Sequence, residues 1–264
     1  MSDPHPTAPG LSGKHATKAW GRAELARLGT ELAVAQEQLY AQAKVAGSTR
    51  RVLLVLQAMD CGGKDGTVKR VAGMMNPQGM HITTFGKPTE EELAHDFLWR
   101  IRPAVPAPGL IGIFNRSHYE DVLVVRVHQL VKPSVWRARY KKINAFESEL
   151  ARDGVAILKV MLHISYEEQE ARLAERLTDP TKYWKFNPAD LDERQRWADY
   201  AAAYEAALGR CHTEEAPWYV IPADRKWYRN WAVAQVLAET LTDLDPSYPS
   251  RDLDIPALKR RLKR

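Results

Sequence analysis

One segment of the chain, residues 57–67, predicts both a local fold and a type of ligand. A continuous apolar run, 52–56, comes directly before it, and the segment reads Gln57-Ala58-Met59-Asp60-Cys61-Gly62-Gly63-Lys64-Asp65-Gly66-Thr67. Its three glycines allow the backbone to turn N–H groups toward phosphate oxygens, and Lys64 adds a positive charge. We therefore interpret the segment as a phosphate-binding loop between a strand and a helix.

The loop departs from the pattern G-x-x-x-x-G-K-[ST] at two positions. Ala58 stands at the first glycine, and Asp65 stands at the hydroxyl residue that normally binds Mg²⁺. A carboxylate beside bound phosphates would repel them unless a cation lies between, and Mg²⁺ takes one or two carboxylates together with phosphate oxygens. Asp60 and Asp65 therefore indicate a metal site. The alternative is a tight turn with capping aspartates and no phosphate.

Composition is typical of a soluble globular protein, with 45% hydrophobic and 27% charged residues among 264. Residues 1–16 contain no apolar run, which argues against a signal peptide or membrane anchor and favours a cytoplasmic location. Cys61 and Cys211 lie far apart and form no disulfide or metal pattern. The net charge of +5 includes five basic residues among the last six, a segment we expect to be solvated.

Strand-like and helical segments alternate along the chain. Helical spacing over 20–45 precedes five apolar, β-rich runs, at 52–56, 81–85, 110–114, 156–164 and 218–221. Capping boxes at 89–92 and 165–168 indicate two helix starts. Continuous apolar runs are typical of strands buried on both faces, so the pattern predicts a parallel sheet covered by helices, with the phosphate loop at its carboxyl edge.

A second polar cluster follows the strand predicted at 110–114. Asn115 and Arg116 come directly after that strand, and Glu120 and Asp121 follow one turn later. Arg116 could clamp phosphate oxygens, and the two acids would supply the negative charge that orders Mg²⁺ in nucleotide kinases. The alternative is a capped helix start with a surface salt bridge. We expect His118 and His128 to be structural, because phosphoryl transfer needs little proton transfer.

A third stretch, 165–186, has the features of a mobile lid. Arg172 and Arg176 are four residues apart and share one helix face. A basic and aromatic string, 182–186, follows Pro180. Arginines in a closing lid neutralise charge on a transferred phosphoryl group. The alternative is a solvent-exposed helix in which Glu168 pairs with Arg172.

Together these stretches resemble the family-2 polyphosphate kinases, P-loop enzymes that move phosphate between inorganic polyphosphate and nucleotides. The resemblance covers about residues 20–245, and its matching segments are 59–67, Asn76-Pro77-Gln78-Gly79, Phe97-Leu98-Trp99-Arg100, 114–127, Trp184-Lys185-Phe186 and 216–223. It implies a P-loop kinase-like, three-layer α/β/α fold with a parallel sheet and a small helical lid at about 165–195. A single kinase domain, 19–250, would lie between a flexible segment, 1–18, and a basic tail, 251–264.

The resemblance also implies an activity. The chain would transfer the terminal phosphoryl group of polyphosphate to AMP and/or ADP, reversibly, giving ADP or ATP. Transfer would be direct and assisted by Mg²⁺, with Mn²⁺ as the expected substitute. Glu120-Asp121 is similar to the class III branch, whose members phosphorylate both AMP and ADP. The expected partners are polyphosphate and adenine or guanine nucleotides, with no nucleic acid and no membrane, and the expected assembly is a homo-oligomer, either a dimer or a tetramer.

The resemblance also implies roles for the residues of this sequence that stand at matching positions of the family's motifs. The implied catalytic residues are Asp60, Lys64, Arg116, Glu120 and Asp121, with Asp60 and Asp121 as the metal ligands. The implied phosphate and nucleotide contacts are Cys61, Gly62, Gly63, Asp65, Gly66, Thr67, Lys69, Arg172, Arg176 and Lys185. At position 61 alanine or serine is more familiar in the family. A small side chain suffices there, so we expect cysteine to preserve activity.

Two other functions fit parts of the sequence. The first is a nucleoside-triphosphate-dependent nucleotide kinase, which would have a less basic entrance to its site. The second is a nucleic-acid-binding P-loop ATPase, which would use the basic tail and the aromatic-basic lid. The sequence contains no RNP, helix-turn-helix or zinc pattern that would support the second.

Overall fold

The computed structural model describes residue 11 and residues 17–263. Its α-helices are α1 (Lys18–Ala46), α2 (Lys64–Val71), α3 (Glu90–Ala94), α4 (Val124–Val127), α5 (Pro133–Arg152), α6 (Tyr166–Thr178), α7 (Ala189–Gln195), α8 (Trp197–Cys211), α9 (Lys226–Leu244) and α10 (Ile255–Leu262). Short 3₁₀ helices are η2 (Ala72–Met74), η3 (Pro77–Gly79), η4 (Arg102–Ala104), η5 (His118–Asp121) and η6 (Pro180–Lys185). Most of the prediction for 1–18 falls outside the described residues.

Five parallel strands form one sheet in the order β2-β3-β1-β4-β5. The strands are β1 (Arg51–Ala58), β2 (Met80–Thr84), β3 (Ile111–Asn115), β4 (Val155–His163) and β5 (Trp218–Pro222). Each predicted strand is confirmed, with ends that shift by one or two residues. The all-buried pattern of β1 and β3 explains why their sequences are continuously apolar and do not alternate.

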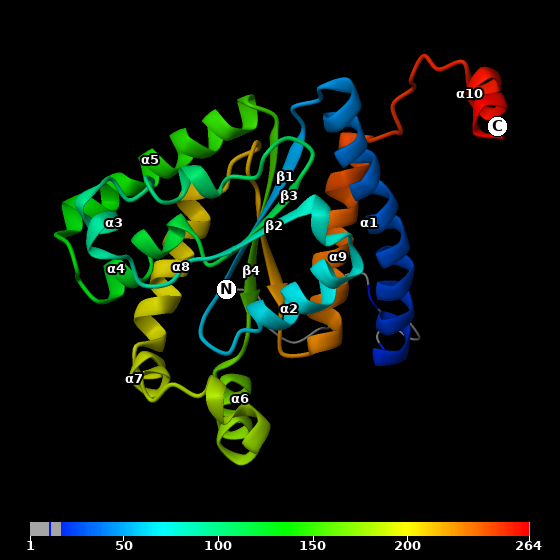
Figure 1. The fold of residues 1–264 in the computed structure, drawn as a ribbon. Helices are drawn as coiled ribbons and strands as arrows, with labels where there is room; N and C mark the ends of the chain where they lie inside the picture. Colours follow the sequence, from blue (N-terminus) through cyan, green and yellow to red (C-terminus); the bar gives the residue numbers. More distant parts are fainter. Residues whose placement is uncertain (1–10, 12–16, 264) are drawn as a thin grey trace.

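Helices cover both faces of the sheet (Figure 1). Residues of α1 and α9 pack with one set of sheet side chains, including Leu54 and Val160. Residues of α5 and α8 pack with the other set, including Leu53 and Val55. The alternation of Leu53, Leu54 and Val55 between the two cores follows from the two-residue period of a strand. The predicted three-layer α/β/α fold is confirmed.

The topology places two polar loops next to each other. β1 lies between β3 and β4, with Leu56 beside Asn115 and Ala58 beside Leu162. The loop after β1 and the segment after β3 therefore leave the same edge of the sheet as neighbours. Ligands of open α/β sheets bind in such a crevice at the carboxyl ends of the strands.

One of the two predicted capping boxes is complete. Thr89 accepts from the backbone N–H of Glu92, and the Glu92 carboxylate accepts from the N–H of Thr89. Ser165 accepts from the N–H of Glu168, but its own N–H donates to Asp224 Oδ1 at 2.8 Å. The prediction of a second capping box is therefore wrong for one of its two hydrogen bonds, the one from the Ser165 N–H to the Glu168 side chain.

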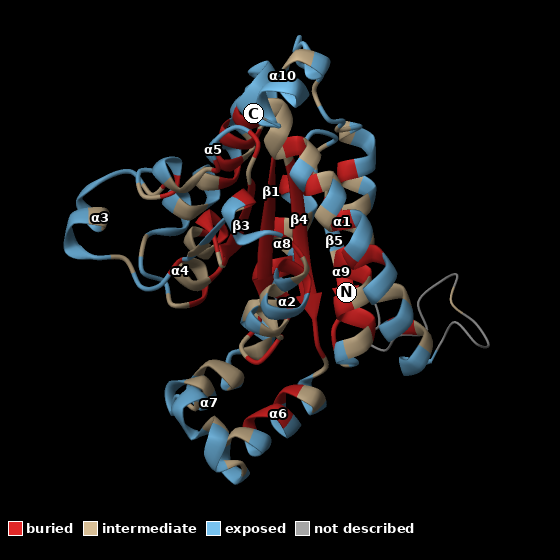
Figure 2. Cartoon of the chain, turned by 45° about the vertical axis from the view of Figure 1, so that its right-hand side comes forward, coloured by how far each residue is buried: buried red, intermediate tan, exposed pale blue. Residues whose placement is uncertain are grey.

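Two outer segments project from the layered body. The lid predicted at 165–195 consists of α6, η6 and α7, which extend beyond the carboxyl edge of the sheet and are largely exposed on their outer sides (Figure 2). At the other end, the basic tail contains α10, which has no buried residue. Its Ile255, Leu258 and Leu262 are exposed apolar side chains.

A buried charged network lies under η5. Lys159 of β4 donates to Glu147 Oε2 of α5 at 2.5 Å, and Tyr119 and His118 contact Glu147 Oε1 at 2.8 and 3.1 Å. The Lys159 ammonium also donates to the Cys211 carbonyl at 2.6 Å. This arrangement agrees with the structural role predicted for His118. It fixes η5, which carries the acidic residues of the site.

Glu147→Gln should reduce the free energy of unfolding by about 3–5 kcal/mol, because it leaves the Lys159 charge buried without a counter-ion. Urea denaturation measures this. Glu149→Gln, two residues away on α5, is the matched control. Because Glu149 pairs with Arg102 at an exposed site, this variant should change stability little. Equal losses in the two variants would contradict this interpretation.

Candidate active site

The phosphate loop has the backbone geometry that its glycines predict. Gly63 has φ of 100° and Cys61 has φ of 61°, both in the left-handed region. A Cβ at Gly62 would lie 2.4 Å from the Ala58 Cβ. Ala58 can therefore replace the first glycine of the motif because position 62 has no side chain. Burial raises the pKa of the Cys61 thiol, so the thiol stays protonated at neutral pH.

Lys64 is the first residue of α2 and bends back over the loop. Its Nζ donates to the Ala58 carbonyl at 3.0 Å. Burial, followed by the positive charge of Arg116, lowers the pKa of Lys64. A phosphate placed beside this ammonium would counter both effects, so the site favours an anion.

Two predicted phosphate contacts of the loop have partners within the protein. Thr67 is buried, and its hydroxyl donates to the Gly63 carbonyl at 3.1 Å. Asp65 accepts a hydrogen bond from Asn115 Nδ2 at 2.8 Å, which links α2 to the end of β3. Thr67 thus holds the loop turn in place, and Asp65 joins the two polar segments.

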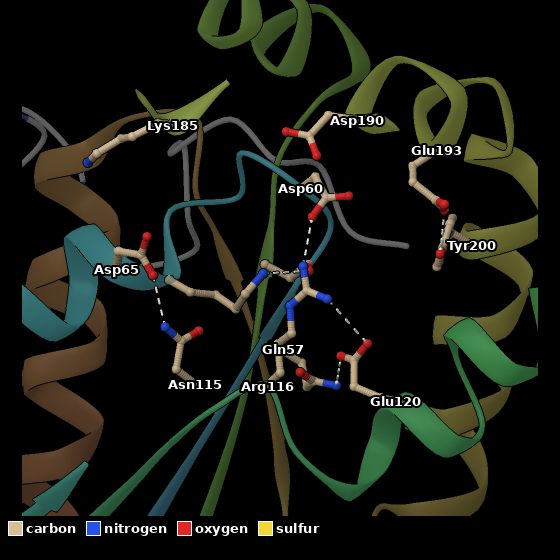
Figure 3. Close-up of polar contacts among 12 residues, drawn as sticks. Gln57, Asp60, Asp65, Asn115, Arg116, Glu120, Lys185, Asp190, Glu193 and Tyr200 are labelled. Carbon is tan, nitrogen blue, oxygen red and sulfur yellow. Dashed lines mark hydrogen bonds and ion pairs between the residues drawn. The ribbon is translucent and has the colours of Figure 1, made fainter. Parts of the chain in front are cut away.

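Arg116 is the centre of a charged cluster drawn in Figure 3. Its φ of 63° turns the side chain toward the loop, where Nη2 donates to Asp60 Oδ1 at 3.2 Å. Nη1 lies 3.8 Å from Glu120 Oε2, and Glu120 also accepts from Gln57 at 3.0 Å. Burial acts to lower the pKa of Arg116, but Glu120 and Asp60 raise it. The structure brings together the predicted residues Asp60, Lys64, Arg116 and Glu120.

Asp121 is oriented differently from its neighbour. Its carboxylate accepts from Arg139 Nη1 at 2.9 Å, and its carbonyl accepts from the same nitrogen at 3.0 Å. Burial raises the pKa of Asp121, although Arg139 opposes the shift. Arg139 pairs with this carboxylate at 2.9 Å, whereas Arg116 lies 3.2 Å from Asp60 and 3.8 Å from Glu120, so Asp60 and Glu120 are less closely paired and more exposed than Asp121.

A cavity of about 780 Å³ opens beside the loop. Its size suits a small molecule. Asp60, Arg116, Glu120 and Asp121 line one side, and its other walls are largely apolar or aromatic, including Phe85, Leu123, Val124, Trp197 and Tyr204. The arrangement combines a charged end for phosphates with a wider apolar space.

Several cavity residues were not predicted from the sequence. Asp190 of α7 pairs with Arg176 at 3.1 Å, and burial, followed by the negative charge of Asp60, raises the pKa of Asp190. Across the cavity, Glu193 accepts from the Tyr200 hydroxyl at 2.6 Å and lies 3.0 Å from His128 Nε2. His128 therefore lines the site and is not confined to the core. Figure 3 shows Asp190 close to Asp60, and Glu193 beside Tyr200.

The first lid helix is tied to the loop by hydrogen bonds to backbone carbonyls. Gln169 Nε2 donates to the Asp60 carbonyl at 3.0 Å, and Arg172 Nη1 donates to the Cys61 carbonyl at 2.8 Å. Arg172 also donates to the carbonyls of Ala223 and Asp224 and to Glu168 Oε1. It is only 6% exposed. Arg172 is thus a buried anchor, contrary to the expectation of a polyphosphate-binding side chain, and its pairing with Glu168 is the one the alternative predicted.

The other predicted basic contacts lie further out. Lys185 is exposed in η6, with Nζ 4.9 Å from the centroid of Trp184. Lys69 is exposed on α2 and does not line the cavity. Arg176 is partly exposed and donates to the Lys185 carbonyl at 3.0 Å. Arg176 is the more exposed of the two lid arginines, and its partner Asp190 lines the cavity.

The donor set suits a metal that shares its coordination with a substrate. Within 17–263 and residue 11, no three His, Cys, Asp or Glu side chains are grouped to hold an ion by themselves. Asp60 nevertheless faces the cavity with one oxygen bonded to Arg116, and Glu120 and Asp190 lie nearby. Mg²⁺ binds one or two carboxylates and takes its remaining ligands from phosphate and water, so this set fits Mg²⁺.

Comparisons with known proteins agree with this geometry. The family model for polyphosphate kinase 2 matches residues 15–249. The "AMP/ADP-polyphosphate phosphotransferase" of Meiothermus ruber is 51% identical over 94% of this chain and 89% of its own length. The "ADP-polyphosphate phosphotransferase" of Rhodopseudomonas palustris is 43% identical over 86% of this chain and 80% of its own length.

A solved structure is similar over nearly the whole chain. The crystal structure of polyphosphate kinase 2 from Arthrobacter aurescens TC1 matches with a TM-score of 0.95 and 47% identity, covering 99% of this chain and 91% of that one. Within the described residues, no helix has the length and apolar composition needed to cross a bilayer.

Proposed function

This chain belongs to the polyphosphate kinase 2 family, and from that premise we propose that it transfers the terminal phosphoryl group of inorganic polyphosphate to AMP and ADP, reversibly. The observation that carries the proposal is the phosphate loop, over which Lys64 bends back and whose Asp60 lines, together with Arg116, a cavity large enough for a nucleotide. The names of the Meiothermus ruber and Rhodopseudomonas palustris relatives support the same substrates.

The residues of this chain would act mainly by positioning and charge stabilisation. Direct phosphoryl transfer requires little covalent chemistry from the protein. Loop N–H groups and Lys64 would hold a phosphate at the carboxyl edge of the sheet. Asp60 and Glu120 would keep Arg116 in place, and its planar guanidinium would bind the oxygens of a second phosphate group. Glu120, oriented by Gln57, would hold the Arg116 guanidinium toward that phosphate.

We propose Mg²⁺ as the cofactor, with Mn²⁺ as a substitute. Asp60 would hold it, with Glu120 or Asp190 completing the protein ligands. When bound, the ion would neutralise charge shared between donor and acceptor phosphates. Asp121, first expected as a ligand, would instead keep Arg139 in the cavity wall.

The acceptor base would occupy the apolar part of the cavity. Aromatic side chains there, Phe85, Trp197 and Tyr204, offer surfaces for a purine. The class III resemblance leads us to propose both AMP and ADP as acceptors. Incubation with Mg²⁺, polyphosphate and each of AMP, ADP, GMP and GDP, followed by chromatography, tests the acceptor range. No phosphorylation of either adenine nucleotide would contradict the proposal.

The alternatives considered from the sequence fit less well. Family membership argues against a kinase restricted to nucleoside triphosphates and against a nucleic-acid-binding ATPase. We propose that the protein acts in the cytoplasm as a homo-oligomer, without nucleic acid. Size-exclusion chromatography with light scattering would measure the subunit number.

The two lid arginines should respond differently to substitution. Arg172→Met should reduce the free energy of unfolding by about 3 kcal/mol, because it removes a buried charge that holds the loop to α6 and leaves Glu168 without its partner. Arg176→Met should change stability by less than about 1 kcal/mol but reduce polyphosphate turnover about 10- to 1000-fold. Arg176→Lys should restore part of the loss, since an ammonium lacks the bidentate geometry.

Urea denaturation and steady-state rates separate these two roles. If Arg172→Met keeps wild-type stability, Arg172 is not the anchor described above. If Arg176→Met keeps wild-type turnover, Arg176 has no role in phosphoryl transfer.

Salt should affect the two substrates unequally. Polyphosphate would contact several partly exposed cations, including Arg176 and Lys185. Screening increases as the Debye length falls from ~10 Å at 0.1 M to ~3 Å at 1 M. The KM for polyphosphate should therefore rise steeply with added KCl, and the KM for nucleotide should rise less. Parallel increases would argue against a basic polyphosphate path.

A further inference from the structure

Arg229 of α9 lies directly behind the phosphate loop. A Cβ at Gly63 would lie 1.8 Å from its Nη1, and a Cβ at Gly66 would lie 3.0 Å from its Nη2. The guanidinium therefore occupies the space that a side chain at position 63 would need. It is 3% exposed, so the loop backbone and its surroundings separate it from bulk water.

This buried cation has no counter-charge within the described protein. Its Nε and Nη2 donate to the neutral Oδ1 of Asn230 at 3.1 and 2.8 Å. No carboxylate of the described residues forms an ion pair with it. Burial, followed by the positive charge of Arg172, lowers the pKa of Arg229 to about 10, so it remains charged at neutral pH.

The two other buried arginines of the described chain differ in this respect. Arg51, 6% exposed, pairs with the Asp153 carboxylate and donates to two carbonyls. Arg172, equally buried, pairs with Glu168 and donates to three carbonyls. An isolated buried charge is costly unless it is paired. For Arg229, the missing negative charge is what a phosphoryl group in the loop would supply.

We propose that Arg229 is a charge-stabilising positioning residue for the condensed phosphate or nucleotide phosphate held by loop 59–67. It acts through the glycine backbone, at a buried position where little bulk water screens its field. The bound phosphate completes its electrostatic environment, so the unliganded protein carries the cost of the uncompensated charge and the liganded protein does not. The inference deepens the proposed function and rests on it.

Thermal unfolding with and without tripolyphosphate tests this, in metal-free buffer at constant ionic strength. A ligand that binds only the folded state stabilises it by RT ln(1 + [L]/Kd), so the rise of Tm with ligand concentration gives an apparent Kd. The variants are Arg229→Gln, which can still donate to Asn230, and Arg229→Lys, which keeps the charge. Arg51→Met is the control for loss of a buried arginine that has its own carboxylate. Polyphosphate kinetics with AMP supply KM and kcat for each variant.

We expect Arg229→Gln to unfold at or above the wild-type temperature without ligand, and to bind tripolyphosphate at least about tenfold more weakly. Its KM for polyphosphate should rise by a similar factor, with partial recovery in Arg229→Lys. Arg51→Met should unfold at a lower temperature but keep the wild-type Kd. A merely structural arginine would lower Tm and leave both KM and Kd unchanged.

Two results would overturn the inference while leaving the proposed function intact. One is a wild-type response to tripolyphosphate in Arg229→Gln. The other is failure of both Arg229 variants to fold, which would show that the guanidinium group supports the fold without any anion. If the wild-type protein itself shows no response to tripolyphosphate, the inference fails. If it also transfers no phosphate from polyphosphate to AMP in the kinetic assays with Mg²⁺, the proposed function fails as well.

Discussion

Lys64→Ala is expected to reduce phosphoryl transfer on the order of 100- to 1000-fold while the protein stays folded. Lys64 is the first residue of α2, and its side chain makes one hydrogen bond, to the Ala58 carbonyl, so its loss opens no core cavity. The substitution removes the ammonium group of Lys64. Among the described residues, no other lysine ammonium lies at the loop. Turnover with polyphosphate and AMP, measured beside circular dichroism, checks both parts.

Arg70→Ala is the matched control for this substitution. Arg70 lies on the same helix, α2, but is exposed and does not line the cavity. Its variant should keep most of the wild-type rate. If Lys64→Ala is folded and keeps most of its activity, the assignment of the phosphate loop is wrong.

Removal of divalent cations should abolish transfer, and Asp60→Asn should reduce it strongly at limiting Mg²⁺. A neutral amide keeps the shape of Asp60 and its contact with Arg116 but binds Mg²⁺ weakly among phosphates. The expected signature is a higher Mg²⁺ concentration for half-maximal rate, with partial recovery at high Mg²⁺. Titration of the rate with Mg²⁺ at fixed substrate measures this.

Asp192→Asn provides the control for the metal prediction. Asp192 is an exposed aspartate of α7 and does not line the cavity. Its Mg²⁺ dependence should match the wild type. Full activity of the wild-type protein in excess chelator would exclude the metal role of Asp60.

Most of the fold could be predicted because its strands have an unmistakable composition. Strands buried on both faces require continuous apolar runs, and β1 and β4 contain little else apart from buried polar residues such as Lys159. Strand ends shifted by one or two residues because hydrogen bonding to the neighbouring strand, and not local composition, decides where pairing stops. The second half of the Ser165 capping box failed for a similar reason, since Asp224, distant in sequence, takes the backbone N–H.

The site could be predicted where its residues follow strands, and less well where they come from the lid. Asp60, Arg116 and Glu120 meet because parallel neighbouring strands end at one edge. Helical spacing alone placed Arg172 and Arg176 on one face, but it cannot show that one packs against the loop and the other stays partly exposed.

Asp190 and Arg229 could not be found from local sequence at all. Asp190 approaches Asp60 only through the packing of α7 over the cavity. Arg229 lies more than 160 residues from the loop in an ordinary amphipathic helix, and its contact with Gly63 exists only in three dimensions. The roles of these two charged residues can be inferred only when their burial and their hydrogen-bond partners are known.

The most direct test of the account is a comparison of phosphoryl donors. The purified protein is incubated with Mg²⁺ and AMP, with either polyphosphate or ATP as the sole donor, and nucleotides are resolved by ion-exchange chromatography over time. With polyphosphate as the sole donor, the wild-type protein should convert AMP to ADP and then ATP, and Lys64→Ala should not. Conversion of AMP only when ATP is the donor would contradict this prediction.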